Sequence, residues 1–141
     1  MNIVEKGIMR GPRIDLAFQT EFNTSLDLAS GAQVWGDHLP LEEAMEGDLC
    51  GIRVYGHPLG GILPPTIKEL RLAVQFMLRC KAQNKPLYVH CEHGVDRTGM
   101  VCAAFRVIAQ NWSPMMAARE ALTHGMHWVY LPWLIQLWRL K

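Results

Sequence analysis

The sequence predicts an α/β protein, a three-layer sandwich in which helices flank a mainly parallel central sheet. Short apolar runs typical of strands alternate along the chain with segments of helical spacing, a pattern that favours parallel strands joined by helical crossovers. The run Leu-Tyr-Val at 87–89 is typical of a parallel strand that is buried on both faces. With 141 residues the chain has the size of one domain, so we treat 1–141 as a single domain.

The first half of the chain predicts short elements separated by loops. Glycine and proline punctuate it, and its apolar stretches are brief. Weak alternation marks strands, whereas a cluster of helix formers that ends at Gly47 marks a short helix. The elements expected in order are a loop with at most one helical turn over 1–20, a strand over 23–28, a helix over 41–46, a strand over 52–55 and a loop over 56–65.

The second half carries stronger signals. Thr66 followed by Glu69 forms a capping-box pattern, and apolar residues then recur at helical spacing. Ser113 with Pro114 at the first helical position marks another helix start, and Gly125 marks its end. The elements expected in order are a helix over 66–81, a strand over 86–90, a loop over 91–96, a helix over 97–110 that is buried on most sides, a helix that ends at 125 and an amphipathic stretch over 132–140.

Composition and charge argue against several classes of function, although they leave room for a local basic patch. Half of the residues are apolar, 19% are charged and the formal net charge is +1, so no bulk electrostatic attraction favours nucleic acid or a membrane surface. Four cysteines without the spacing of a disulfide scaffold, and an amino terminus without a signal segment, predict a reducing cytoplasm. The longest apolar run, 128–138, falls well short of the roughly 20 residues of a membrane span. We therefore expect a cytoplasmic monomer without nucleic-acid or membrane partners.

The informative stretch is Val-His-Cys-Glu-His-Gly-Val-Asp-Arg-Thr-Gly over 89–99, between a predicted buried strand and a predicted helix. A loop in this place directs backbone N–H groups into a concavity, and the helix behind it adds the positive end of its dipole. Together they suit a tetrahedral dianion such as phosphate. The same field stabilises a thiolate, so Cys91 is the candidate nucleophile.

The residues after Cys91 complete this candidate site. Arg97 can fold over the loop, bind two phosphate oxygens with its planar fork and stabilise charge in the transition state. Thr98 can donate its hydroxyl to the sulfur, and we expect His90 to order the loop through backbone hydrogen bonds. The residues expected to line the phosphate site are Glu92, His93, Gly94, Val95, Asp96 and Arg97.

A metal site is the competing interpretation of the same stretch. His90, Cys91 and His93 have suitable side chains, but three ligands within four residues, without a second spaced pair, fit zinc poorly. We therefore expect no metal. His124 and His127 are expected to be surface or satisfied histidines, and the other cysteines, at 50, 80 and 102, to be buried core residues.

The string His-Cys, five residues, Arg-Thr-Gly over 90–99 resembles the signature loop of the protein-tyrosine-phosphatase superfamily, and the short chain is most similar to its compact dual-specificity branch. The likeness covers nearly the whole chain. The resemblance implies a dual-specificity-phosphatase-like fold and a two-step reaction, in which the thiolate attacks phosphorus and water hydrolyses a phosphocysteine, without metal or cofactor. Further segments that resemble this branch are Arg10-Gly11-Pro12-Arg13, Gly51-Ile52-Arg53-Val54, and Trp112-Ser113 with Ala118, Glu120 and Gly125.

The resemblance also implies a general acid, normally an aspartate in a loop roughly thirty residues before the cysteine, that protonates the leaving oxygen. Residues 55–66 contain no Asp or Glu here, and their titratable candidates are His57 and Tyr55. Asp96 is another option, because some phosphoinositide phosphatases of the superfamily carry an aspartate at this loop position. His57 and Asp96 both stay open as possible acids.

The predicted activity is hydrolysis of phosphate monoesters, in phosphorylated protein at Tyr, Ser or Thr or in small aryl phosphates. Glu92 and Asp96 bring negative charge into the loop, which disfavours crowded polyanions relative to a single phosphate. Because residues 55–66 lack an aspartate that could act as general acid, a second hypothesis is a catalytically weak module that binds phosphorylated ligands. Sulfur-transfer or arsenate chemistry on a similar thiolate loop is a third.

Overall fold

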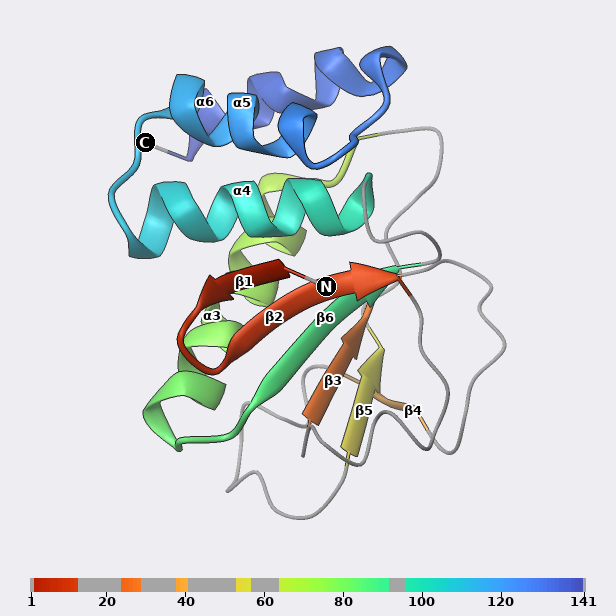
Figure 1. The fold of residues 1–141 in the computed structure, drawn as a ribbon, viewed down its shortest axis with the longest axis vertical. Coiled ribbons are helices and arrows are strands. Elements are labelled where there is room, and N and C mark those ends of the chain that lie inside the picture. Colours follow the sequence, from red (N-terminus) through yellow and green to blue (C-terminus); the bar gives the residue numbers. More distant parts are fainter. Residues whose placement is uncertain are drawn as a thin grey trace.

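The computed structural model describes residues 2–12, 24–28, 38–40, 53–56, 64–91 and 96–140. Within these residues six strands form one sheet in the order β1-β2-β6-β3-β5-β4 (Figure 1). Every neighbouring pair is parallel except β1 with β2, which confirms the predicted mainly parallel sheet. The strands are β1 Asn2–Glu5, β2 Ile8–Pro12, β3 Thr24–Asp27, β4 His38–Pro40, β5 Arg53–Gly56 and β6 Leu87–Cys91.

The first two strands show that the loop predicted over 1–20 was wrong for residues 2–12. β1 and β2 form an antiparallel hairpin, and its turn contains Gly7 at φ 87°, a conformation that glycine adopts without strain. β2 then pairs along its whole length with β6, a partner remote in sequence. The residues Arg10, Gly11 and Pro12 have no strong strand propensity of their own, and tertiary pairing overrides that local preference.

The other predicted strands are confirmed to within one residue at each end. The strand predicted over 23–28 is β3, which is one residue shorter at both ends, and those predicted over 52–55 and 86–90 are β5 and β6, each shifted by one residue towards the carboxyl terminus. The three-residue strand β4 was not predicted. The helix expected over 41–46 and most of the loop expected over 56–65 lie outside the described residues.

The helices begin where their capping signals predict. Before α3, Glu69 N donates to Thr66 Oγ1 (3.1 Å) and Thr66 N donates to Glu69 Oε1 (2.9 Å), which completes the capping box. Before α5, Met116 N donates to Ser113 Oγ (3.2 Å). The helices are α3 Ile67–Ala82, α4 Arg97–Ala109, α5 Pro114–Thr123, the 3₁₀ helix η1 Trp128–Ile135 and α6 Gln136–Arg139.

The end of the chain differs from the amphipathic stretch predicted over 132–140. Helical structure already begins at Trp128, as the 3₁₀ helix η1, and only the last four helical residues form α6. Pro132 lies inside η1 and has no N–H to donate, which favours the tighter and less regular helix over a continuous α-helix.

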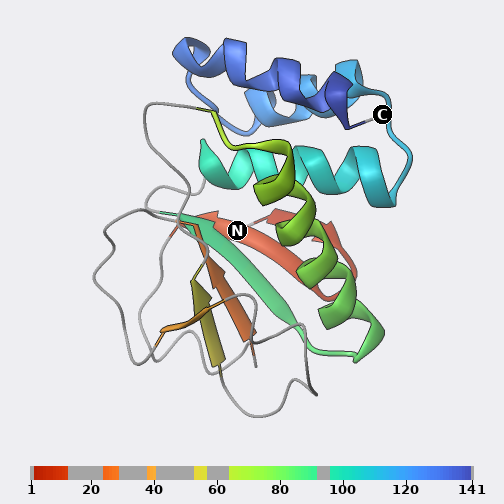
Figure 2. The same ribbon diagram turned by 180° about the vertical axis from the view of Figure 1, so that it is seen from behind.

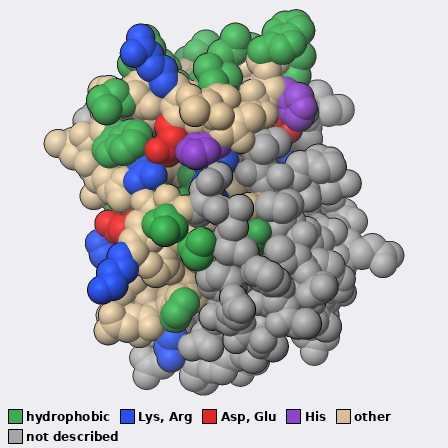
Figure 3. All heavy atoms as spheres, viewed as in Figure 1, with side chains coloured by type: hydrophobic (Ala, Val, Ile, Leu, Met, Phe, Trp, Pro, Cys, Tyr) green, Lys and Arg blue, Asp and Glu red, His purple; other side chains and the backbone are tan. Residues whose placement is uncertain are grey.

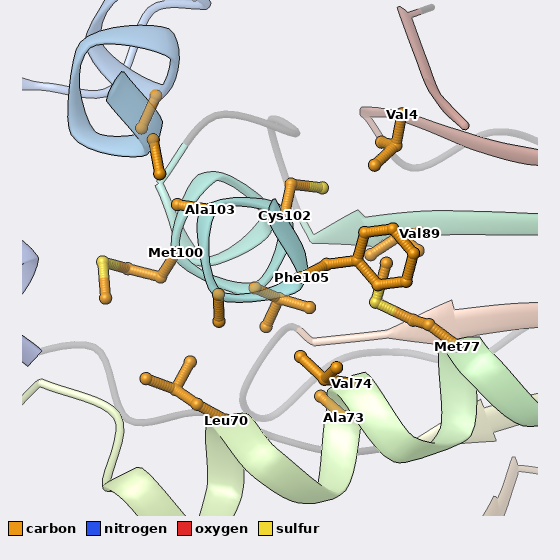
Figure 4. Close-up of a cluster of buried hydrophobic side chains, with 14 of the residues drawn as sticks. Val4, Leu70, Ala73, Val74, Met77, Val89, Met100, Cys102, Ala103 and Phe105 are labelled. Atoms are coloured by element: carbon orange, nitrogen blue, oxygen red, sulfur yellow. The ribbon is translucent and has the colours of Figure 1, made fainter. Parts of the chain in front are cut away.

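The core lies between the sheet and the pair α3 and α4, and α5, η1 and α6 stack on α4 (Figures 1 and 2). Phe105 of α4 and Met77 of α3 meet Val89 of β6 within it (Figure 4). Residues 98–105 of α4 are all buried, which confirms the prediction of a helix buried on most sides. This packing holds α4 in a fixed position over the sheet.

Both faces of β6 are covered. Leu87, Val89 and Cys91 belong to the core, whereas Tyr88 and His90 alternate with them, point to the opposite face and are also buried. Parallel strands that are buried on both faces are typical of layered α/β folds. The predicted α/β sandwich fold class is therefore confirmed.

Exposed apolar side chains gather on η1 and α6. Trp128, Val129, Ile135 and Trp138 are each about half exposed or more, and Figure 3 shows hydrophobic side chains along the end of the molecule where these helices lie. Among the described helices, none has both the length and the apolar character needed to cross a membrane.

Candidate active site

Cys91 is the last residue of β6, a strand with parallel neighbours on both sides. Those neighbours end at the same level, since Pro12 of β2 pairs with Cys91 and Asp27 of β3 pairs with His90. In open α/β sheets, ligands bind outside the carboxyl ends of such strands. Cys91 is 3% exposed and is therefore buried at this end of the sheet.

The first turn of α4 lies at the same edge. The helix begins at Arg97, and Figures 1 and 2 both show its start beside the carboxyl end of β6. Asp96 occupies the N-cap position, yet its side chain makes no capping hydrogen bond to the helix. The first N–H groups of an α-helix have no partners within the helix and carry the positive end of its dipole. This helix start can therefore attract an anion at the end of β6.

Thr98 places a hydroxyl inside the protein at this helix start. Its side chain is fully buried, and within the described part of the chain its Oγ1 has no hydrogen-bond partner. A buried hydroxyl left unpaired costs about 1–3 kcal/mol, so its presence calls for an explanation. Donation to a reacting sulfur or to a bound oxyanion would supply one.

Gly99 lets other parts of the chain come close to the first turn of α4. A Cβ at this position would lie 3.1 Å from Met126 Cε and 3.7 Å from Arg10 Nη2. Arg10 comes from β2 and is 2% exposed, so it brings a buried positive charge to the helix start. Such a charge adds to the attraction of the helix dipole for an anion.

Asp96 is bound by a residue from the segment between α5 and η1. The main-chain N of His127 donates to Asp96 Oδ1 (3.0 Å), and His127 Nδ1 lies 3.0 Å from both carboxylate oxygens. The side chain of Asp96 is 18% exposed, whereas that of His127 is 62% exposed. The pair therefore joins a partly buried carboxylate at the start of α4 to an imidazole at the surface.

None of the cysteines in the described residues forms a disulfide, and all of them are buried. Burial raises the pKa of Cys80 to about 12 and the pKa of Cys102 to about 11, although the charge of Arg10 opposes the rise at Cys102. These two thiols stay protonated at neutral pH, which agrees with their predicted role as core residues. Burial, and then the charge of Cys91, raises the pKa of Tyr88 to about 12.

Four of the predicted site residues come together here: Cys91 at the end of β6, and Asp96, Arg97 and Thr98 at the start of α4. In the described ranges, no group of three or more His, Cys, Asp or Glu side chains is arranged to hold a metal ion. The remaining candidates lie outside the described residues: Glu92, His93, Gly94, Val95 and His57.

Arg10 and His127 lie near the site but were not among the predicted site residues. Arg10 was named only as part of a segment that resembles the family, and its approach to the helix start depends on the pairing of β2 with β6, which was not predicted. His127 was expected at the surface, where it is, but its contact with Asp96 was not foreseen. The two residues are 31 positions apart, and no local pattern reports such a contact.

Comparison with known proteins identifies the family. The model of a polymorphic toxin system DSP-PTPase phosphatase matches residues 23–111, more than half of the chain. The chain therefore belongs to this family of phosphatases, within the protein-tyrosine-phosphatase superfamily and its dual-specificity branch, as the signature loop predicted.

Curated relatives match over shorter stretches. The mouse (Mus musculus) phosphatidylglycerophosphatase and protein-tyrosine phosphatase 1 is 40% identical over 50 residues, which are 36% of this chain and 26% of the mouse protein. The dual specificity protein phosphatase TpbA of Pseudomonas aeruginosa is 37% identical over 54 residues, 38% of this chain and 24% of TpbA. The chain thus matches about a quarter of the length of these relatives.

Solved structures share the fold over almost the whole chain. The core catalytic domain of the PP-IP phosphatase SIW14 from S. cerevisiae, in complex with citrate, has a TM-score of 0.71 at 19% identity, over 99% of this chain and 84% of that chain. TpbA of P. aeruginosa has a TM-score of 0.64 at 18% identity, over 95% of this chain and 80% of that chain. At these identities the likeness shows the fold, which is that of the dual-specificity phosphatases.

Proposed function

We propose that the chain is a cysteine-dependent phosphatase that hydrolyses phosphate monoesters through a phosphocysteine intermediate. The observation that carries the proposal is the position of Cys91 at the carboxyl end of β6, beside the start of α4, where the side chain of the N-cap residue Asp96 makes no capping hydrogen bond. Membership of the phosphatase family supports the same conclusion. The positive end of α4 and the buried charge of Arg10 favour both an anionic ligand and the thiolate form of a cysteine at this edge.

In the proposed first step the Cys91 thiolate attacks phosphorus, an S–P bond forms and the bond to the leaving oxygen breaks. Arg97 binds two equatorial oxygens and stabilises the charge of the transition state, a role that its planar fork suits better than a lysine ammonium. Thr98, whose buried hydroxyl has no hydrogen-bond partner among the described residues, donates to the sulfur when Cys91 leaves in the second step. Water then hydrolyses the phosphocysteine and releases inorganic phosphate.

The proposed substrates carry one exposed phosphate on phosphotyrosine, phosphoserine or phosphothreonine, or on a small aryl alcohol. The relatives support this range, since they are named as protein-tyrosine and dual specificity phosphatases, and one solved TpbA structure is a complex with pTyr. Asp96 adds negative charge beside the proposed site, which favours a single phosphate over a crowded polyanion. We also propose a cytoplasmic monomer as the working form.

The test is hydrolysis of an aryl phosphate by the purified chain beside Cys91→Ser and Arg97→Lys variants. We expect no turnover with Cys91→Ser and a loss of about 100-fold or more in kcat with Arg97→Lys. Cys80→Ala, which removes a buried thiol in α3, is the matched control and should keep its activity. Phosphate binding without turnover by the unmodified chain would instead support the binding module.

A further inference from the structure

The contact between Asp96 and His127 bears on the proton donor that the proposed reaction needs. Both carboxylate oxygens of Asp96 lie 3.0 Å from His127 Nδ1, and Oδ1 also accepts the main-chain N–H of His127 at 3.0 Å. A proton on either oxygen of Asp96 would occupy a position from which that oxygen accepts a hydrogen bond of His127. The carboxylate is therefore arranged to accept hydrogen bonds from His127 and not to give up a proton of its own.

The imidazole of His127 is held in one orientation. Its Nδ1 faces Asp96, and the ring of Tyr130 meets it nearly edge-on, with 6.4 Å between centroids. Tyr130 in turn packs on the buried Trp133 at 4.4 Å. Because the two ring nitrogens lie on opposite sides of an imidazole, Nε2 points away from Asp96, and the side chain is 62% exposed. A proton on Nε2 is thus available to a molecule in solution.

The segment that carries His127 is fixed to the first turn of α4. Gly125 ends α5 at φ 100°, a left-handed conformation that turns the chain. Met126 then packs at Gly99, where an added Cβ would lie 3.1 Å from the methionine Cε. His127 follows directly and binds Asp96, the residue before Arg97. Two adjacent contacts therefore hold the imidazole beside the helix start that is proposed to bind phosphate.

We propose that His127, oriented by Asp96, is the general acid that protonates the leaving oxygen. The inference rests on the proposed function and deepens it, and it takes the place of the aspartate that residues 55–66 lack. The arrangement follows a carboxylate–histidine pair, in which the carboxylate fixes the tautomer and stabilises the imidazolium. Asp96 is then a positioning residue and His127 the catalytic one.

The proton balance closes over the two steps. In the first, the Nε2 proton of the imidazolium passes to the leaving oxygen while the S–P bond forms and the P–O bond breaks. In the second, neutral Nε2 takes a proton from the attacking water, the S–P bond breaks, and thiolate, phosphate and imidazolium are restored. Within the described residues, the titratable side chains in contact with the imidazole are Asp96 and Tyr130.

The experiment compares two leaving groups in the full chain. Phenyl phosphate needs protonation of its leaving oxygen, whereas p-nitrophenolate is a weak base and leaves without it. In His127→Gln we expect kcat for phenyl phosphate to fall by about 100-fold or more, while kcat for p-nitrophenyl phosphate changes by less than about fivefold. The basic limb of the phenyl phosphate pH profile should disappear. Asp96→Asn should also lower kcat for phenyl phosphate more than kcat for p-nitrophenyl phosphate, by a smaller factor than His127→Gln. The matched control His124→Gln should leave both kcat values unchanged.

Several outcomes would overturn the inference. Equal losses for both substrates in His127→Gln would assign His127 a structural role only. Selectivity that appears in His57→Ala, and not in His127→Gln, would assign the acid to His57. The proposed function fails separately, since it predicts that Cys91→Ser abolishes turnover of both substrates, whereas the histidine variant keeps one of them.

Discussion

Gly11→Ala should destabilise the protein strongly, because the sheet leaves no room for a methyl group there. A Cβ at Gly11 would lie 2.3 Å from Tyr88 Oη and 3.2 Å from Tyr88 Cζ, about 1 Å short of van der Waals contact with the oxygen. Tyr88 is fully buried and packs against His90 at 5.6 Å, so its ring has little freedom to move. Overpacking of a rigid site costs about 1–3 kcal/mol, and we expect the upper end of that range.

The assay is thermal unfolding followed by circular dichroism, together with a double-mutant cycle. A cost of about 3 kcal/mol lowers the melting temperature by about 10 °C in a chain of this size. Tyr88→Phe removes the oxygen of the closest contact, so Gly11→Ala should cost only about 1 kcal/mol in that background. Gly7→Asn is the control, because nothing lies within 4 Å of its Cβ position and asparagine tolerates its positive φ. A melting temperature of Gly11→Ala within about 2 °C of the unmodified chain would refute the reasoning.

Three further predictions concern buried charge and thiols. Arg106 donates to both carboxylate oxygens of Glu120, at 2.9 and 3.1 Å. Glu120→Gln leaves the guanidinium of Arg106 as a partly buried charge without an opposite charge, so the free energy of unfolding in urea should fall by about 2–4 kcal/mol. A fall below about 0.5 kcal/mol would contradict this. The raised pKa of Cys102, from 9.0 to about 11, means that the folded chain keeps a proton that the unfolded chain releases. The contribution of Cys102 to the free energy of unfolding is fully present below pH 9 and is lost as pH rises through 11, by about 3 kcal/mol in all. In Cys102→Ala the free energy of unfolding should therefore depend less on pH between 9 and 11. Iodoacetate at neutral pH should modify Cys91 before Cys102, and inorganic phosphate should slow the modification of Cys91. The modified residues are identified by mass spectrometry, and modification of Cys102 first would contradict the proposed thiolate at Cys91.

Sequence reasoning predicted the elements whose signals are local. The capping box at Thr66 and the Ser113-Pro114 start both fix helix ends through hydrogen bonds within four residues. β1 and β2 were missed because nothing local marks them. β2 is a strand because it pairs with β1 on one side and with β6 on the other. β6 lies about eighty residues further along the chain, so a short stretch of sequence around β2 cannot reveal that pairing.

The candidate site divides in the same way. Cys91, Arg97 and Thr98 could be predicted because strand, loop and helix follow one another within a single short segment. Arg10 and His127 reach the site from β2 and from the segment after α5, which tertiary packing brings to the start of α4. Predicting such contacts requires the packing of α4 against its neighbours, and that packing depends on residues spread over the whole chain.

Glu120 and Trp112, two of the residues that extended the resemblance beyond the signature loop, have a structural role. Glu120 binds Arg106, whose guanidinium also stacks on Trp112 at 4.5 Å from the ring centroid and donates to Val4 O. These contacts join α5, α4 and β1, so they hold α5 in a fixed position against α4. The segment after α5 brings His127 to Asp96, and its placement depends on that fixed position. The contacts of Arg106 that stabilise the fold therefore also set the position of His127, the proposed acid. Because Glu120→Gln weakens these contacts, it should lower the turnover of phenyl phosphate more than that of p-nitrophenyl phosphate.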